Sequence, residues 1–201
     1  MTRSTAPSVI VLAGPNGAGK TTAAPALLRG TLGVMEFVNA DTIAQGLSGF
    51  DPERAAIPAG RAMLQRIEEL ARQRSSFAFE TTLASRTFAP WLAQLTATAG
   101  YRFHLVFLWL PSADFAVDRV ADRVRLGGHS VPEATIRRRY AAGLRNFFGL
   151  YQPLATTWRI HDNSDPSGMK LIASGKGSRI NKVGNRTIWE RILAEYGHRA
   201  D

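Results

Sequence analysis

The sequence contains no cysteine. This absence excludes a disulfide framework, a cysteine-ligated zinc site and a thiol nucleophile. Long hydrophobic runs are also absent near the start of the chain, where the apolar segment Val9–Ala13 is far too short for a signal sequence or a membrane span. We therefore expect a cytoplasmic protein that has no membrane partner.

Acidic residues are scarce. The 201 residues include 16 Asp and Glu against 25 Lys and Arg, which gives a formal net charge of +9 and a pI near 10.8. Such a surface attracts nucleic acid, or its arginines converge on phosphate within a site. We favour the second interpretation because six arginines crowd into one stretch, at Arg119, Arg123, Arg125, Arg137, Arg138 and Arg139.

A glycine-rich motif follows the first apolar run. Residues 14–21 read Gly-Pro-Asn-Gly-Ala-Gly-Lys-Thr and match the phosphate-loop pattern G-x-x-x-x-G-K-[ST] at every position. A β-branched run precedes the motif and a helix-compatible segment follows it, so the loop has the strand–loop–helix context that it needs. Its backbone N–H groups would surround the phosphates of ATP. The predicted nucleotide-binding residues are Gly14, Asn16, Gly17, Ala18, Gly19, Lys20, Thr21 and Thr22.

Strand patterns alternate with helical periodicity along the remaining chain. The alternation predicts one α/β domain over residues 1–201, the three-layer sandwich of phosphate-loop NTPases, with helices on both faces of a mostly parallel sheet. We expect about five or six strands, at 9–13, 34–40, 77–79, 104–110, 158–161 and, as an edge strand, 170–174. The expected helices cover about 20–29 (kinked or shortened by Pro25), 51–74, 88–99, 113–125, 132–147 and 187–196. Residues 168–198 thus supply an edge strand and a helix, and residues 175–185 a mobile loop between them.

Polar residues at the carboxyl ends of the parallel strands are the candidate reactive groups. Asp41 follows the second strand, where it is either the general base for an acceptor hydroxyl or a cap of the next helix. Glu80 and Thr82 follow the third strand and are candidates for holding the substrate. Mg²⁺ would be bound by Thr21 together with Glu80 or, alternatively, Asp41.

The arginine-rich stretch predicts a lid over residues 114–147. Gly127-Gly128-His129 lies between two helical segments that carry arginines, which is typical of a segment that closes over a triphosphate. Planar guanidinium groups stabilise negative charge on a transferring phosphoryl group, as does the Lys20 ammonium. We expect two or three of the six arginines to contact phosphate, and His129 to pack in the lid rather than to act in catalysis.

Four segments together resemble the zeta-toxin family of phosphate-loop kinases, and most closely its small chromosomal members. They are the phosphate loop, Asn39-Ala40-Asp41, Phe79–Leu83 and Gly127–Pro132 with the following Ile136–Tyr140. Zeta toxins phosphorylate the 3′-hydroxyl of UDP-activated amino sugars. Their partner is an antitoxin protein, which is a separate chain. The resemblance implies that Asp41 is the base, that Glu80 and Thr82 contact substrate, and that Arg123 with Arg138 or Arg139 surrounds the γ-phosphate.

The sequence thus predicts a kinase that uses ATP and Mg²⁺ to phosphorylate a hydroxyl of a small molecule. A polynucleotide 5′-hydroxyl kinase is the alternative that the basic surface favours. A nucleotide switch or binding protein is the alternative outside the transferases, and it would need a residue that orients water and a partner surface. Asp41 and the lid fit an acceptor hydroxyl better.

Overall fold

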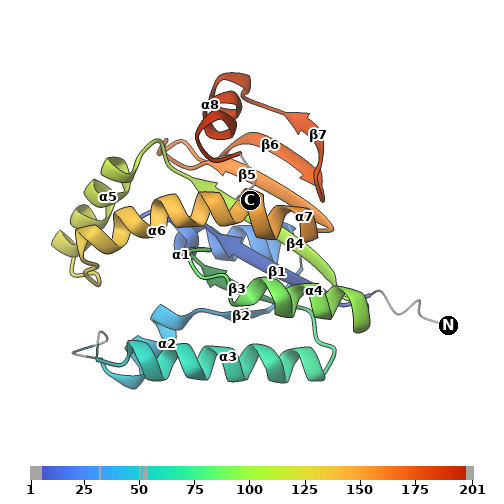
Figure 1. Cartoon of the computed structure of the whole chain (residues 1–201). Helices are drawn as coiled ribbons and strands as arrows, with labels where there is room; N and C mark the ends of the chain where they lie inside the picture. Colours follow the sequence, from blue (N-terminus) through green and yellow to red (C-terminus); the bar gives the residue numbers. More distant parts are fainter. Residues whose placement is uncertain (1–5, 32, 50, 52–53, 198–201) are drawn as a thin grey trace.

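The computed structural model describes residues 6–31, 33–49, 51 and 54–197, and these form a layered α/β fold (Figure 1). Seven strands make one sheet in the order β2-β3-β1-β4-β5-β6-β7. The strands are β1 (Ser8–Ala13), β2 (Glu36–Val38), β3 (Phe77–Thr81), β4 (Arg102–Trp109), β5 (Thr157–Asp162), β6 (Lys170–Lys176) and β7 (Arg179–Val183). The first five are parallel, whereas β6 and β7 are antiparallel to their neighbours. The predicted fold class is confirmed.

The helices lie on both faces of this sheet. In Figure 1, α4, α6 and α7 pass in front of the sheet and α1 lies behind it. The helical segments are α1 (Lys20–Ala24), the π-helical η1 (Pro25–Thr31), α2 (Ala40–Leu47), α3 (Ala56–Arg72), α4 (Phe88–Thr98), α5 (Ala113–Arg125), α6 (Glu133–Asn146), the π-helical η2 (Phe147–Tyr151), α7 (Gln152–Leu154) and α8 (Arg186–Tyr196). The α-helix that starts at Lys20 ends at Ala24, so Pro25 shortens it as predicted.

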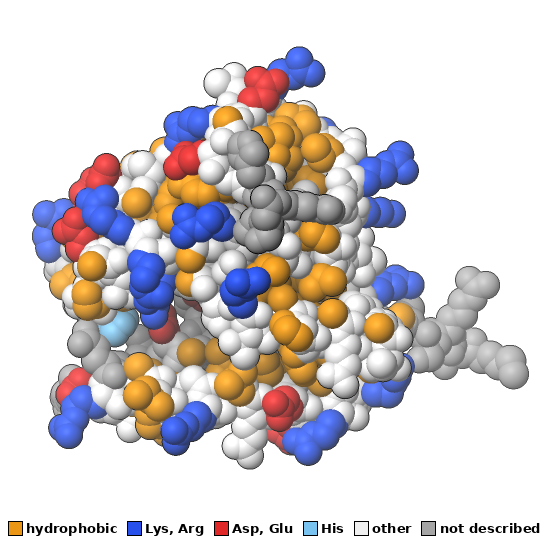
Figure 2. All heavy atoms as spheres, in the orientation of Figure 1, with side chains coloured by type: hydrophobic (Ala, Val, Ile, Leu, Met, Phe, Trp, Pro, Cys, Tyr) orange, Lys and Arg blue, Asp and Glu red, His pale blue; other side chains and the backbone are white. Residues whose placement is uncertain are grey.

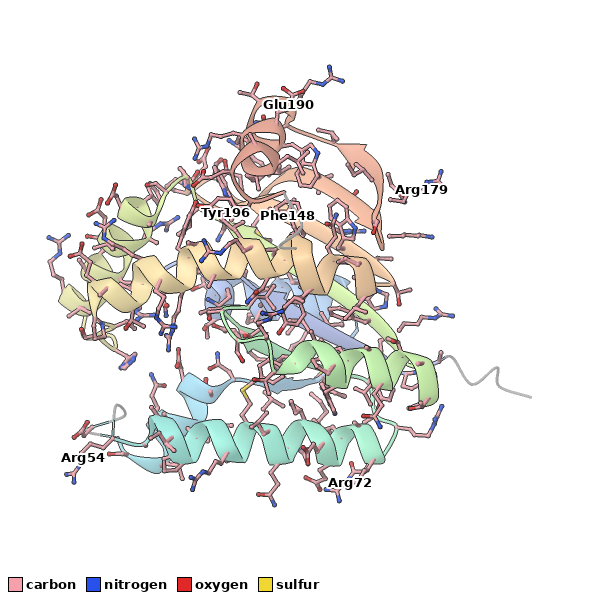
Figure 3. All side chains as sticks on the ribbon, viewed as in Figure 1. Arg54, Arg72, Phe148, Arg179, Glu190 and Tyr196 are labelled. Carbon is pink, nitrogen blue, oxygen red and sulfur yellow. The ribbon has the colours of Figure 1, made fainter. Side chains whose placement is uncertain are left out.

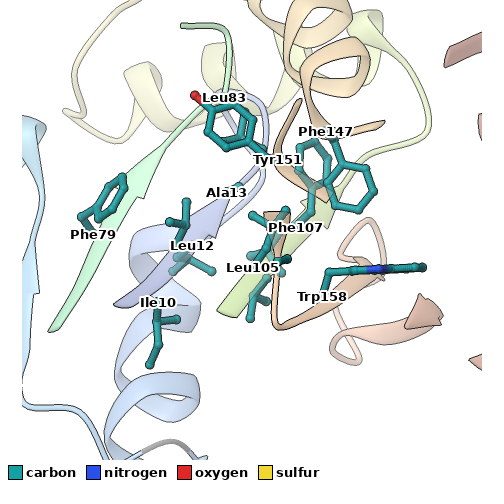
Figure 4. Packing of buried hydrophobic residues seen from close by; sticks show 14 of the residues in the cluster. Ile10, Leu12, Ala13, Phe79, Leu83, Leu105, Phe107, Phe147, Tyr151 and Trp158 are labelled. Carbon is teal, nitrogen blue, oxygen red and sulfur yellow. The ribbon is translucent and has the colours of Figure 1, made fainter. Parts of the chain in front are cut away.

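The core is built on β1 and β4, which are buried on both faces. Val9 to Ala13 are fully buried, as are Phe103, Phe107 and Leu108 (Figure 4). Such strands read as continuous apolar runs because each face is covered. Phe107 packs edge-on against Phe147 of η2 at 5.3 Å between ring centroids, and Trp158 of β5 stacks on Trp189 of α8 at 5.7 Å. Aromatic contacts thereby fix helices η2 and α8 on one face.

Two element boundaries differ from the sequence expectation. The second strand covers only 36–38, because Asn39 accepts hydrogen bonds from the backbone N–H groups of Asp41 and Thr42 and so starts α2 at Ala40. The third helix begins at Ala56 rather than at Asp51, and the predicted Pro52 and Glu53 at its start lie outside the described residues.

The expected mobile loop at 175–185 is a β-hairpin, and the prediction of a loop there is wrong. Strand β7 pairs with β6 through a turn at Gly177, whose φ of +49° favours glycine. All five residues of β7 are exposed. Because no face of this edge strand is buried, its sequence lacks the apolar alternation that identifies strands.

Gly175 provides a test of the hairpin packing. A Cβ at this position would overlap the Arg179 carbonyl oxygen and lie 2.5 Å from Cζ2 of Trp158. We expect Gly175→Ala to lower the free energy of unfolding by about 1–3 kcal/mol, as overpacking does. In contrast, Gly60 in α3 has open space around its Cα, so the control Gly60→Ala should raise stability by about 0.5–1 kcal/mol. Urea denaturation measures both, and an unchanged Gly175→Ala midpoint would contradict the packed hairpin.

Candidate active site

The phosphate loop connects β1 to α1 and depends on glycine conformations. Gly14, Gly17 and Gly19 all have positive φ, of 142°, 78° and 73°. A Cβ at Gly14 would overlap the carbonyl oxygen of Leu108, and one at Gly19 would lie 2.9 Å from Nδ2 of Asn163. The loop backbone therefore packs directly on the end of β4 and on the segment after β5. Asn163 secures it further, since its Nδ2 donates a 2.8 Å hydrogen bond to the Ala18 carbonyl.

Lys20 is buried at the start of α1, with 6% of its surface exposed. Its Nζ donates a 2.9 Å hydrogen bond to the Pro15 carbonyl and lies 3.6 Å from Oε1 of Glu80. Burial lowers the pKa of Lys20 below its ordinary value, while the carboxylates of Glu80 and Asp41 act in the opposite direction. The ammonium is thus held at the mouth of the phosphate loop by one carbonyl and one carboxylate.

Glu80 joins three parts of the site. Its Oε2 accepts a 2.9 Å hydrogen bond from the Thr21 hydroxyl and a 2.8 Å hydrogen bond from Nδ2 of Asn39. A hydroxyl and a carboxylate side by side are oxygen donors of the kind that Mg²⁺ takes in nucleotide sites, where it keeps waters and phosphate oxygens as its other ligands. Thr21 and Glu80, the predicted pair, therefore fit a magnesium ion.

Asn39 is a site residue that the sequence reasoning missed as a functional position. Its Oδ1 caps α2 and its Nδ2 holds Glu80, so one buried amide connects β2, α2 and β3. The signal was an Asn immediately before a helix, which is a strong capping preference. Because Asn39 is the cap, Asp41 does not have that role. The Asp41 carboxylate is exposed and borders a cavity.

A cavity of about 190 Å³ lies between the phosphate loop, α2 and the end of β3. Lys20, Asp41, Glu80, Thr82 and Arg139 all line it, so residues predicted to act together do converge. A neighbouring cavity of about 180 Å³ shares Asp41 and Arg139 and is also lined by Gln45 and His129. Figure 2 shows the hollow at the left of the molecule, with cationic side chains around it and a carboxylate inside.

The third-strand end that carries Thr82 is held by α6. Leu83 has a φ of +56°, which is uncommon for a non-glycine residue, and its N–H bonds to the Thr81 hydroxyl. Nδ2 of Asn146 donates to the carbonyl oxygens of Leu83 and Ala84. Gly143 gives the Thr82 carbonyl room, since a Cβ there would overlap it. Helix α6 therefore positions the predicted substrate contact.

The predicted lid consists of α5, a short connection and α6. Gly127 has a φ of +83°, and its N–H bonds to the Val124 carbonyl while that of Gly128 bonds to the Arg123 carbonyl at 2.9 Å. This bond pattern is the Schellman motif, which ends α5 and requires a left-handed residue. The two glycines that the sequence marked as a hinge are thus the end of a helix packed against Arg123.

The six lid arginines have different surroundings. Arg139 is half-buried in the cavity, where its Nη1 lies 3.4 Å from Oδ1 of Asn16. Burial and the neighbouring Arg138 lower the pKa of Arg139, and Asp41 opposes them. Arg123 donates a 2.7 Å bond to the His129 carbonyl, and its Nε is buried without a partner in the described structure. The remaining four are turned elsewhere: Arg119 to the Asn163 and Ser164 carbonyls, Arg125 to Asp122, Arg137 to Asp114 and Glu133, and Arg138 to solvent.

The sequence pattern of a known family, the AAA domain (AAA_33), matches residues 9–142, which are two thirds of the chain. The match includes the phosphate loop, Asp41, Glu80 and the arginines of the lid. The chain belongs to this AAA domain family. A protein from Haemophilus influenzae, described as uncharacterized, is 29% identical to this AAA domain over 136 residues, which cover 65% of this chain and 91% of that protein.

Solved structures share the fold of this AAA domain. The complex of AvrRxo1-ORF1 with AvrRxo1-ORF2, in a structure with sulphate ions, superposes with a TM-score of 0.72 at 19% identity. The match covers 98% of this chain and 67% of the other. The structure of the same complex with ATP superposes with a TM-score of 0.68 at 20% identity, and the match covers 94% of this chain and 64% of the other. A structure of the PezAT chromosomal toxin-antitoxin system of Streptococcus pneumoniae superposes with a TM-score of 0.63 at 15% identity. The match covers 100% of this chain and 84% of that one. These structures therefore share the α/β fold of this chain.

Within the described part of the chain, no helix has the length and hydropathy that a membrane crossing requires.

Asn39 leads to a testable prediction. Asn39→Ala removes the α2 cap and should lower stability by about 1 kcal/mol. The matched control is Asn185→Ala, because Asn185 caps α8 in the same way through the Ile188 N–H, away from the phosphate loop. Both variants should lose similar stability in urea. Only Asn39→Ala should also weaken Mg²⁺-dependent ATP binding in calorimetry, since it releases Glu80. Equal nucleotide affinity in the two variants would contradict this role.

Proposed function

We propose that this protein is an ATP-dependent phosphotransferase that acts on a hydroxyl group of a small molecule. The observation that carries the proposal is the shared cavity, in which an exposed Asp41 carboxylate faces the phosphate loop together with Lys20 and Arg139. A carboxylate that neither caps a helix nor forms an ion pair in the described structure is available to accept a proton. This arrangement suits a reaction in which a hydroxyl must be activated next to a triphosphate.

The proposed reaction is a direct transfer. The acceptor oxygen forms a bond to the γ-phosphorus, its proton passes to the Asp41 carboxylate, and the bond from the γ-phosphorus to the bridging oxygen breaks to leave ADP. Lys20 stabilises the negative charge on the β- and γ-phosphate oxygens. Arg139 already lines the cavity, and Arg123 with Arg138 would complete the positive charge around the γ-phosphate when the lid closes.

Nucleotide binding rests on the loop backbone and on two side chains. Backbone N–H groups of the phosphate loop and of the start of α1 would surround the phosphates, where the helix dipole favours negative charge. Thr21 and Glu80 are the residues that would hold Mg²⁺, which would neutralise charge on the phosphate oxygens. Glu80 would then exchange its hydrogen bond from the Thr21 hydroxyl for the ion, while Asn39 keeps the carboxylate in place.

The acceptor site that we propose is compact. Cavities of about 190 and 180 Å³ meet at Asp41 and Arg139, and Thr82 and Glu80 present oxygen atoms to the first. This space suits a polyhydroxylated molecule with an anionic group, of which a UDP-activated amino sugar, implied by the zeta-toxin resemblance, is our specific candidate. We also propose an antitoxin protein as a partner, which the similarity to the PezAT toxin-antitoxin structure supports. A cytoplasmic location agrees with the supply of ATP.

Labelled ATP distinguishes this function from its two alternatives. Protein would be incubated with ATP labelled at the γ-phosphate and with separate pools of UDP-sugars, oligonucleotides or buffer alone. We expect label on a sugar, and none with Lys20→Ala, because removing a charge contact of this kind costs on the order of 10²–10³-fold in rate. Label on oligonucleotides would identify a polynucleotide kinase, the alternative favoured by the net charge of +9. Label found only as free phosphate would identify a nucleotide switch.

Asp41→Asn separates the base from a metal ligand. The amide keeps the shape of the side chain but cannot accept the proton, so we expect transfer to fall by about 10²–10⁴-fold. Mg²⁺–ATP affinity measured by calorimetry should stay within a few-fold of wild type. If affinity collapses with Mg²⁺ present, Asp41 belongs to the metal site and Glu80 becomes the candidate base. Glu68→Gln serves as the control, because it removes an exposed carboxylate of α3 that lines neither cavity.

A further inference from the structure

The strands at the β7 side of the sheet carry an excess of positive charge. Strands β4 to β7 contain six Lys and Arg residues but a single carboxylate, Asp162. One of the six, Lys170, forms an ion pair with Asp165 in the preceding loop. The other five are exposed and have no ion pair with any described residue: Arg102, Arg159, Lys176, Arg179 and Lys182.

The strand register places these cations on one face. Trp158 and Ile160 are buried on the side of η2 and α8, so Arg159 between them points to the opposite side. Arg159 pairs with Ser174 of β6, which pairs in turn with Lys182 of β7. Residues paired across strands share a face, and Lys176 with Arg179 forms the next row. We call the five cations with Ser174 the basic sheet face.

The field of the basic sheet face acts on two histidines. His104 of β4 and His161 of β5 each follow a cation of this face by two residues and therefore lie on the same side of the sheet. Burial lowers the pKa of His104, and Arg102 and Arg159 lower it further. Burial and then Arg159 do the same for His161. Like charges directly opposite each other on a sheet destabilise it, and Lys176 lies opposite Arg179 on the neighbouring strand.

The basic sheet face is remote from the candidate active site. In Figure 1 the lid helices α5 and α6 reach to the left of the molecule, whereas β7 lies at its upper right. The labelled Arg179 points outward at that edge in Figure 3, and Figure 2 shows a row of cationic side chains along the same margin. An anion bound here does not occupy the phosphate loop.

We propose that the basic sheet face binds the phosphate backbone of a nucleic acid. Lys, Arg, Ser and Thr are the side chains that contact phosphates, and Thr157 and Ser174 lie among the cations. A protein partner would require an apolar centre rich in aromatic residues and poor in charge. The described residues of the basic sheet face form no such centre, because they are mostly charged and the aromatic side chain of β5, Trp158, is buried on the opposite side of the sheet. Binding is therefore electrostatic and independent of base sequence.

The test is fluorescence anisotropy of a labelled single-stranded RNA titrated with the full-length protein at several salt concentrations, with single-stranded DNA and a duplex as further arms. The variant is Arg159→Gln/Lys182→Gln. The control, Arg61→Gln/Arg72→Gln, removes two charges from exposed side chains of α3. We expect only the first to weaken binding, with a slope of log K against log salt that is shallower by about 1.4, or 0.7 for each lost contact. Lys20→Ala should bind like wild type.

Three results would overturn the proposal. Equal weakening in the α3 control would show that net charge alone attracts RNA. Loss of binding in Lys20→Ala would place the oligonucleotide at the phosphate loop. A poly-glutamate peptide that competes as strongly as RNA of equal charge would assign the face to an acidic protein. Circular dichroism checks that the variants are folded, and Lys176→Gln/Arg179→Gln repeats the measurement with an independent pair.

Discussion

The Glu80 carboxylate is the interaction on which the rest of the site depends. It lies 3.6 Å from a buried ammonium and accepts hydrogen bonds from Thr21 and Asn39. A buried lysine without a counter-charge is costly, and Glu80 with the Pro15 carbonyl provides the compensation for Lys20. The same carboxylate connects β3 to the phosphate loop and to the cap of α2. Its position at the end of an apolar strand therefore sets the distance between the phosphate loop and the cavity beside Asp41.

Two close backbone contacts, at Gly14 and Gly143, also hold the candidate site together. Gly14 lies against the Leu108 carbonyl and Gly143 against that of Thr82, so neither position has room for a side chain. The first contact seats the phosphate loop on the central strand. The second seats α6, and with it Arg139, on the strand end that carries Glu80. The packing of helices on strands is thus what brings charges from distant parts of the sequence into one cavity.

The positive charge of the chain is divided between two regions with different consequences. In the lid, Arg125 and Arg137 form ion pairs with acids on α5 and α6, while Arg123 and Arg139 turn inward. On the sheet, Arg159 and its neighbours have no such partners among the described residues. Ion pairs reduce the positive electrostatic potential around the lid. The cations of the sheet have no such pairs with described residues, so their potential acts on charged solutes. The net charge of +9 therefore does not describe one surface.

The sequence by itself determined the phosphate loop, the α/β class and the strand end that carries Glu80, because glycine conformations and apolar runs are local properties. Only the tertiary structure decided that Asn39 rather than Asp41 caps α2, that Arg139 rather than Arg138 enters the cavity, and that residues 179–183 form a strand. An exposed edge strand has no hydrophobic pattern, and a charged residue on a helix turns inward or outward according to what packs beside it. Both depend on neighbours that are distant in the sequence.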